Sequence, residues 1–154
     1  SNQDVDNPDV PNLDIWFTYT LSIWVLHDRG FEGYIISMPP YGVTKESYLA
    51  GYKWEGKYIN HSLAGDFEMN ISRAYKIPNT WVLDGVNTAI EENFQYTSWD
   101  ESIDAGWTHC GKIDKDPERY GKSVLRKRGD DGKLTDTNNS TNDFTPDSTP
   151  SLKK

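Results

Sequence analysis

The strongest constraint on the fold of this chain is a period of two in its hydrophobic residues. Residues 14–27, DIWFTYTLSIWVLH, alternate between an apolar set and a second set in which tryptophans bracket hydroxyl side chains. Because successive side chains of a β-strand point to opposite faces, this pattern predicts a strand with two different faces. The second face consists of Trp16, Thr18, Thr20, Ser22 and Trp24.

The alternation continues downstream of this strand. Turn residues in HDRGFEG precede a short apolar run at 34–38, so we expect that run to form a hairpin with the opening strand. Thr44 is compatible with a helix start, but Gly51 and Gly56 each weaken a helical interior by about 1 kcal/mol. We therefore expect a strand from about Gly51.

Two further strands follow from the same pattern. Residues 66–77 alternate as a strand. The pair Asp84-Gly85 lies between apolar residues and is favoured in tight hairpin turns, because both residues tolerate positive φ. It predicts a turn, followed by a strand over 86–96.

The clearest helix start comes late in the chain. Asp116 is a good N-cap, Pro117 suits the first helical position, and basic residues before Gly129 suit the last turn. A short helix over 116–128 is expected, with a hairpin through the GDDG sequence as the alternative. Together these elements predict a mainly β fold, an antiparallel β-sandwich or open barrel with one short late helix, with an α+β fold as the alternative.

The two ends of the chain differ in composition from its middle. Residues 1–13 are acidic and aperiodic and carry prolines, which is typical of an extended leader. Residues 136–154 are rich in Thr, Ser, Asn, Asp and Pro and bury too little apolar surface to offset the entropy of ordering, so a flexible polar tail is expected. A single β-rich domain is predicted over 14–135.

Charge and hydropathy exclude several classes of function. The net charge of -8 repels phosphate backbones and anionic membrane surfaces, so nucleic-acid binding is not expected. The longest apolar stretch is too short, and too rich in Thr and Ser, to cross a bilayer as a helix, so no membrane span is expected.

The aromatic content suggests a binding role. Six Trp and nine Tyr exceed what a core of this size requires, and both side chains combine a flat apolar ring with a hydrogen-bonding group. Sugar rings stack on such planes while neighbouring polar groups bind their hydroxyls. The structural alternative is that Thr simply favours a pleated surface and that the tryptophans lie beneath the leader or another subunit. The candidate ligand-binding residues are Trp16, Thr18, Thr20, Ser22, Trp24, Trp54, Trp99 and Asp100.

No catalytic, metal or cofactor site is predicted. Asp100, Glu101 and Asp104 cluster beside tryptophans, but their spacing lacks the regularity and the glycine of a calcium loop, and acidic runs are usually solvated turns. The three histidines are scattered without short ligand spacing. Cys110 is the single cysteine, which excludes an internal disulfide.

The sequence therefore favours a non-catalytic, extracytoplasmic binding module with carbohydrate as the leading ligand class. The alternative is a structural or accessory interaction protein that uses the same strand face and its extended ends to contact a protein surface. We expect the chain to lie outside the cell or on the cell surface. Glycosylation sequons at Asn60, Asn70, Asn138 and Asn139 permit a secretory origin without showing one.

Overall fold

The chain divides into two compact units. Unit 1 comprises Ser1–Trp24 with Gly42–Lys76, and unit 2 comprises Val25–Tyr41 with Ile77–Lys154. The computed structural model describes residues 8–9, 11–19 and 29–150. Within those residues the strands form three small sheets, which confirms the predicted mainly β class.

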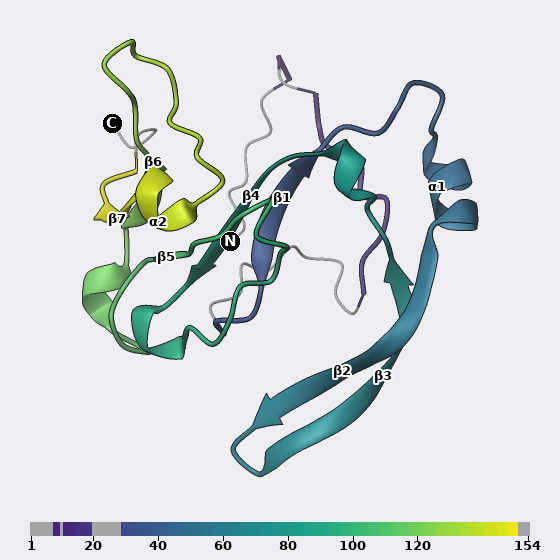
Figure 1. Cartoon of the computed structure of the whole chain (residues 1–154), viewed down its shortest axis with the longest axis horizontal. Coiled ribbons are helices and arrows are strands. Elements are labelled where there is room, and N and C mark those ends of the chain that lie inside the picture. Colours follow the sequence, from purple (N-terminus) through teal and green to yellow (C-terminus); the bar gives the residue numbers. More distant parts are fainter. Residues whose placement is uncertain (1–7, 10, 20–28, 151–154) are drawn as a thin grey trace. The chain divides into compact units, whose positions relative to one another are not determined.

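Unit 1 is built on a helix followed by a long hairpin (Figure 1). Its elements are α1 (Lys45–Gly51), β2 (Lys53–Ser62) and β3 (Gly65–Tyr75). Thr44 begins α1 with a capping box, in which its side chain accepts from the Ser47 N–H and the Ser47 hydroxyl accepts from the Thr44 N–H. The helix start at Thr44 and the strand expected from about Gly51 are both present. They are compatible because α1 ends at Gly51 and β2 begins at Lys53.

The hairpin of unit 1 has one apolar and one charged face in its distal half. Tyr58 lies opposite Met69 and Asn60 lies opposite Phe67, so these side chains share one face. The other face carries the ion pairs Lys57–Glu68 (2.6 Å) and His61–Asp66 (2.8 Å). The pairing shifts register between Trp54 and Gly56, where β3 has an extra residue.

Unit 2 is centred on a three-stranded sheet. The strand order is β1 (Gly33–Ser37), β4 (Val82–Ala89) and β5 (Thr108–His109), with β1 and β4 antiparallel and β4 and β5 parallel. Unit 2 also contains short 3-10 turns and one two-stranded sheet. The elements of unit 2 are β1 (Gly33–Ser37), η1 (Asn79–Trp81), β4 (Val82–Ala89), η2 (Glu91–Asn93), β5 (Thr108–His109), η3 (Pro117–Arg119), β6 (Ser123–Arg126), α2 (Ser140–Asp143) and β7 (Phe144–Ser148).

The predicted turn at Asp84-Gly85 is wrong, because both residues lie inside β4. Gly85 pairs with Ile35, and a Cβ atom at Gly85 would lie only 2.9 Å from Cγ2 of Ile103. The side chains of Trp99 and Ile103 occupy this space on one face of the sheet. Close packing, and not a turn, therefore requires the glycine.

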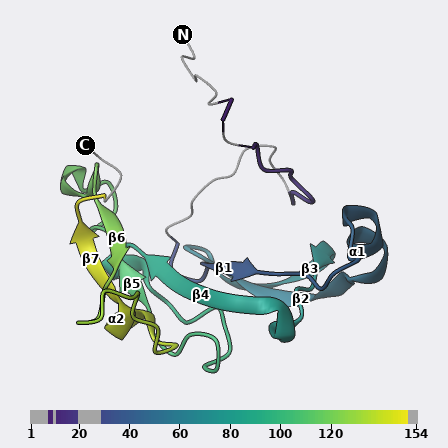
Figure 2. The ribbon, with the colours of Figure 1, turned by 90° about the horizontal axis from the view of Figure 1, so that it is seen from above.

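The opposite face of the sheet contacts β6. Arg126 of β6 forms an ion pair with Asp84 of β4, and its guanidinium stacks over the ring of Phe144 at 4.6 Å. Figure 2 shows β6 and β7 as a separate ribbon beside β5. Both faces of the central sheet of unit 2 therefore have packing partners, Trp99 and Ile103 on one and Arg126 on the other.

The late helix predicted over 116–128 is also wrong. Asp116 caps the N–H of Glu118 at 2.9 Å as expected, but the helical segment is only the single turn η3, and β6 follows. The alternative hairpin is partly confirmed: Arg128 and Leu134 form an isolated antiparallel bridge around the GDDG turn. The segment expected as a flexible tail instead forms α2 and β7 up to Ser148, while residues 151–154 lie outside the described residues.

The opening strand differs from expectation as well. Residues 14–19 have no strand structure, and β1 pairs with β4 and not with this segment. Thr20, Ser22 and Trp24 lie outside the described residues.

Candidate functional site

An aromatic cluster holds the N-terminal segment against α1 and the hairpin in unit 1. Tyr48 of α1 is at its centre, with ring centroids 5.6 Å from Trp16, 5.3 Å from Tyr52 and 5.7 Å from Tyr75. The Phe17 ring lies 4.5 Å from Tyr75. Burial raises the pKa of Tyr48, with a smaller contribution from Tyr75.

A salt bridge reinforces this attachment. Lys45 Nζ lies 3.1 Å from a carboxylate oxygen of Asp14 and donates to the carbonyl of Ile15 at 2.6 Å. Both contacts come from the first residue of α1, so the start of the helix fixes the N-terminal segment beside it. Trp16 therefore serves packing, whereas Thr18 is exposed.

Next to this cluster lies a groove of about 280 Å³ at the register shift of the hairpin. Trp54 lies within it, partly exposed, and its six-membered ring covers Gly56, where a Cβ atom would lie 2.4 Å from Cζ2 of the indole. The groove is lined by Phe17, Lys53, Trp54, Glu55, Ser72, Arg73, Ala74 and Tyr75.

The groove combines an aromatic surface with charged and hydroxyl groups. Lys53 and Glu55 flank Trp54 on β2, and Ser72 and Arg73 come from the register shift in β3, where two residues lie opposite one. Nζ of Lys76 lies 5.9 Å from the centroid of the Trp54 ring. An apolar plane surrounded by both donors and acceptors is suited to a polar ligand with an apolar face.

The family model described as "Protein of unknown function (DUF4876)" matches residues 1–151. The chain belongs to the DUF4876 family. No curated protein and no solved structure matches it.

In this DUF4876 chain the predicted ligand-binding residues fall into separate places. Trp16 and Trp54 are both in unit 1, but Trp16 packs on Tyr48 while Trp54 lines the groove. Trp99 and Asp100 belong to unit 2. Asp100 is exposed and accepts from the N–H and hydroxyl of Ser102, and these hydrogen bonds lower its pKa.

Of the acidic run considered as a catalytic or calcium site, Asp104 has a structural role in the DUF4876 chain. Its side chain is 1% exposed and accepts from the backbone and side-chain amides of Asn87, each at 2.9 Å. It also accepts from Gly106 N at 3.0 Å and from the backbone and hydroxyl of Ser140 at 2.7 and 2.6 Å. These five hydrogen bonds join β4, the 98–107 loop and α2.

The remaining titratable groups do not converge. Among the described residues, no group of three or more His, Cys, Asp or Glu side chains is placed to hold a metal ion. His109 lies 3.9 Å from both Glu91 and Asp147, beyond hydrogen-bonding distance. In the described part of the chain, no helix is long and apolar enough to span a membrane.

Sequence reasoning named Trp54 but missed most of the residues around it in the DUF4876 groove. One signal was available at Arg73. In the alternating series Phe67, Met69 and Ile71, Arg73 stands where the next apolar residue belongs, and this break marks the extra residue of β3. The contribution of Phe17 depends on the tertiary contact with Tyr75, which no local pattern reveals.

Proposed function

We propose that this chain is a non-catalytic extracellular or cell-surface binding module that takes carbohydrate in the groove beside Trp54. The observation that carries the proposal is the partly exposed indole of Trp54 in a groove whose other lining residues include Lys53, Glu55 and Arg73. The C–H face of a sugar ring stacks on an indole, and the surrounding side chains supply donors and acceptors for its hydroxyls.

The non-catalytic part of the proposal rests on how the candidate acids are used. Asp104 is saturated by hydrogen bonds that hold unit 2 together, and Asp100 caps a local turn. Among the described residues that line the groove, Glu55 is the one carboxylate. Hydrolysis of a glycoside generally requires a pair of carboxyl groups, so this groove is suited to binding.

A soluble glycan panel tests the proposal against the purified full chain. Binding is measured by calorimetry for the native chain and for Trp54→Ala, Trp54→Phe and Tyr58→Ala. Tyr58 is the matched control, because it is an aromatic residue of the same strand outside the groove. We expect Trp54→Ala to weaken glycan binding about tenfold or more, with partial recovery in Trp54→Phe and no change in Tyr58→Ala.

Two results would contradict carbohydrate binding in this groove. One is that no glycan of the panel binds the native chain. The other is that Trp54→Ala, shown by circular dichroism to be folded, binds as tightly as the native chain.

A second candidate function, that of a protein-interaction module, is favoured by the distal face of the hairpin. Tyr58, Phe67 and Met69 share that face and are 40%, 49% and 44% exposed. Exposed apolar patches often mark contacts with other proteins. Under this hypothesis, Phe67→Ser abolishes self-association of the purified chain, measured by light scattering, while Trp54→Ala leaves self-association intact.

A further inference from the structure

Unit 2 holds a pocket that is separate from the groove of unit 1. Its volume is about 450 Å³, which lies in the usual range for small-molecule sites. Tyr34 of β1 and Val86 of β4 are a directly opposed pair, and both line the pocket together with Val124 of β6. Its lining is therefore formed partly by apolar and aromatic side chains of two sheets.

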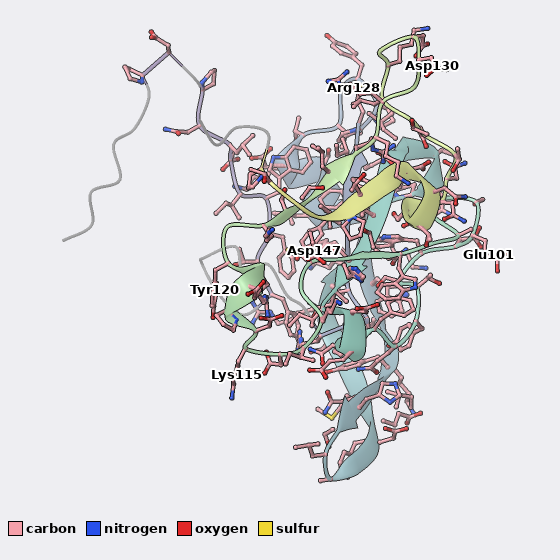
Figure 3. All side chains as sticks on the ribbon, turned by 90° about the vertical axis from the view of Figure 1, so that its left-hand side faces the viewer. Glu101, Lys115, Tyr120, Arg128, Asp130 and Asp147 are labelled. Carbon is pink, nitrogen blue, oxygen red and sulfur yellow. The ribbon has the colours of Figure 1, made fainter. Side chains whose placement is uncertain are left out.

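The loop between β5 and β6 supplies the other side of the pocket. The side chain of Arg119 lies against Gly111, where an added Cβ atom would be 2.7 Å from Cβ of the arginine. The thiol of Cys110 lies 4.0 Å from the carbonyl oxygen of Arg119. Tyr120 follows in the same loop and is 74% exposed (Figure 3), so an aromatic ring stands at the edge of the pocket.

The charged residues that line the pocket are both positive. Among the described residues that line it, these are Arg119 and Lys122, and none is a carboxylate, although the whole chain has a net charge of -8. Within the described residues, the ammonium group of Lys122 forms no ion pair, whereas Arg119 lies 4.0 Å from Asp114. Lys122 thus offers a positive charge beside an apolar surface, with no counter-ion among the residues that the structure describes.

The positive charges of Arg119 and Lys122 also affect the pKa of the Cys110 thiol. Burial raises the pKa of Cys110 and Asp147 adds to the rise, while the positive charges of Arg119 and Lys122 oppose it. Arg119 and Lys122 line the same pocket as this thiol. Cys110 itself lines the pocket, so it can report on what occupies it.

We propose that this pocket binds a small aromatic carboxylate. The aromatic ring lies on Val86 and Val124 between the rings of Tyr34 and Tyr120, and the carboxylate pairs with Lys122 near the surface. An apolar lining beside the Lys122 ammonium suits a monoanion with an apolar body, because the ring gains burial and the charge keeps a partner. This site is independent of the carbohydrate groove.

The only cysteine of the chain provides the test. Cys110 is alkylated with neutral iodoacetamide at mildly alkaline pH and followed by intact mass, with 2-naphthoate as the probe. We expect saturating 2-naphthoate to slow alkylation about fivefold or more, because ligand and reagent compete for one pocket. The uncharged 2-naphthylmethanol should need about tenfold higher concentration for the same protection.

Two matched lysine variants test whether Lys122 supplies the positive charge that binds the carboxylate. Lys122→Gln should raise the half-protecting concentration of 2-naphthoate about tenfold, whereas Lys112→Gln, an exposed lysine of the same loop outside the pocket, should leave it unchanged. Calorimetric titration of the native chain with 2-naphthoate gives a second measure of binding. Absence of protection, equal protection by the alcohol, or equal loss in both lysine variants would overturn the proposal.

The variant Trp54→Ala separates the two proposed sites. Protection of Cys110 by 2-naphthoate should be the same in Trp54→Ala as in the native chain, since Trp54 belongs to unit 1. Failure of glycan binding and failure of naphthoate binding are therefore distinguishable.

Discussion

At the scale of single residues, Asp104 of unit 2 is a buried carboxylate that accepts five hydrogen bonds. Both of its carboxylate oxygens accept hydrogen bonds, three of them from backbone N–H groups of Asn87, Gly106 and Ser140. Asp104→Asn replaces one of these acceptors by an NH₂ group, which would face donors in either orientation. We expect a loss of about 3 kcal/mol in the free energy of unfolding, because buried donors are left without partners.

Asp100→Asn is the control for this change. Asp100 is exposed and its hydrogen bonds are confined to Ser102, so the same replacement should cost about 1 kcal/mol or less. Urea unfolding followed by tryptophan fluorescence measures both variants. Equal costs for the two substitutions would show that the network around Asp104 contributes little to stability.

The role of Asp104 illustrates what the sequence does not reveal about single residues. As a sequence, Asp100, Glu101 and Asp104 form one acidic run next to tryptophans. The partners that distinguish Asp104 lie far along the chain, Asn87 at a separation of 17 residues and Ser140 at a separation of 36. Trp54 was named from its residue type and strand face, whereas the groove around it depends on the register shift between β2 and β3.

At the scale of elements, the short helix α1 depends on its capping box. Thr44→Ala removes the acceptor for the Ser47 N–H and should destabilise the helix by about 1 kcal/mol. Hydrogen exchange measures this locally, because the Tyr48 and Tyr52 N–H groups donate to Thr44 and Tyr48 carbonyls within the helix. We expect exchange at these two amides to be about fivefold faster.

Thr18→Ala is the matched substitution in the same unit, at an exposed threonine that caps no helix. It should leave the exchange of both amides unchanged. If Thr44→Ala also leaves them unchanged, packing of Tyr48 in the aromatic cluster, and not the cap, determines the stability of α1.

Local patterns predicted elements well wherever the local signal and the tertiary environment agree. Residues of β3 alternate between apolar and polar side chains, and residues of β1 form the predicted short apolar run; both strands are present. The turn signal Asp84-Gly85 failed because Trp99 and Ile103 need the space beside the glycine. The 136–150 segment has the composition of a disordered tail, yet Asp143 is buried and accepts from the N–H and hydroxyl of Thr137. Polar residues there order the chain by local hydrogen bonds that composition does not show.

At the scale of the whole molecule, unit 1 interrupts the sequence of unit 2. The chain leaves unit 2 after Tyr41 and re-enters it at Ile77. The segments on either side of residues 42–76 are hydrogen-bonded to each other within unit 2. Ser37 pairs with Val82, and the Met38 N–H donates to the Trp81 carbonyl at 2.8 Å. Residues 42–76 are therefore equivalent to an insertion in the connection between β1 and β4.

Replacing residues 42–76 by a short Gly-Ser loop should leave unit 2 folded, with β1 and β4 as a hairpin. Every interaction of the Asp104 network lies in unit 2, and so does every residue that lines the Cys110 pocket. We expect cooperative urea unfolding with a smaller m-value, since less surface is exposed on unfolding, and undiminished protection of Cys110 by 2-naphthoate. Glycan binding should be lost, because Trp54 has been removed. Non-cooperative unfolding, or loss of the near-ultraviolet circular dichroism of the remaining tryptophans, would show that unit 2 requires unit 1 to fold.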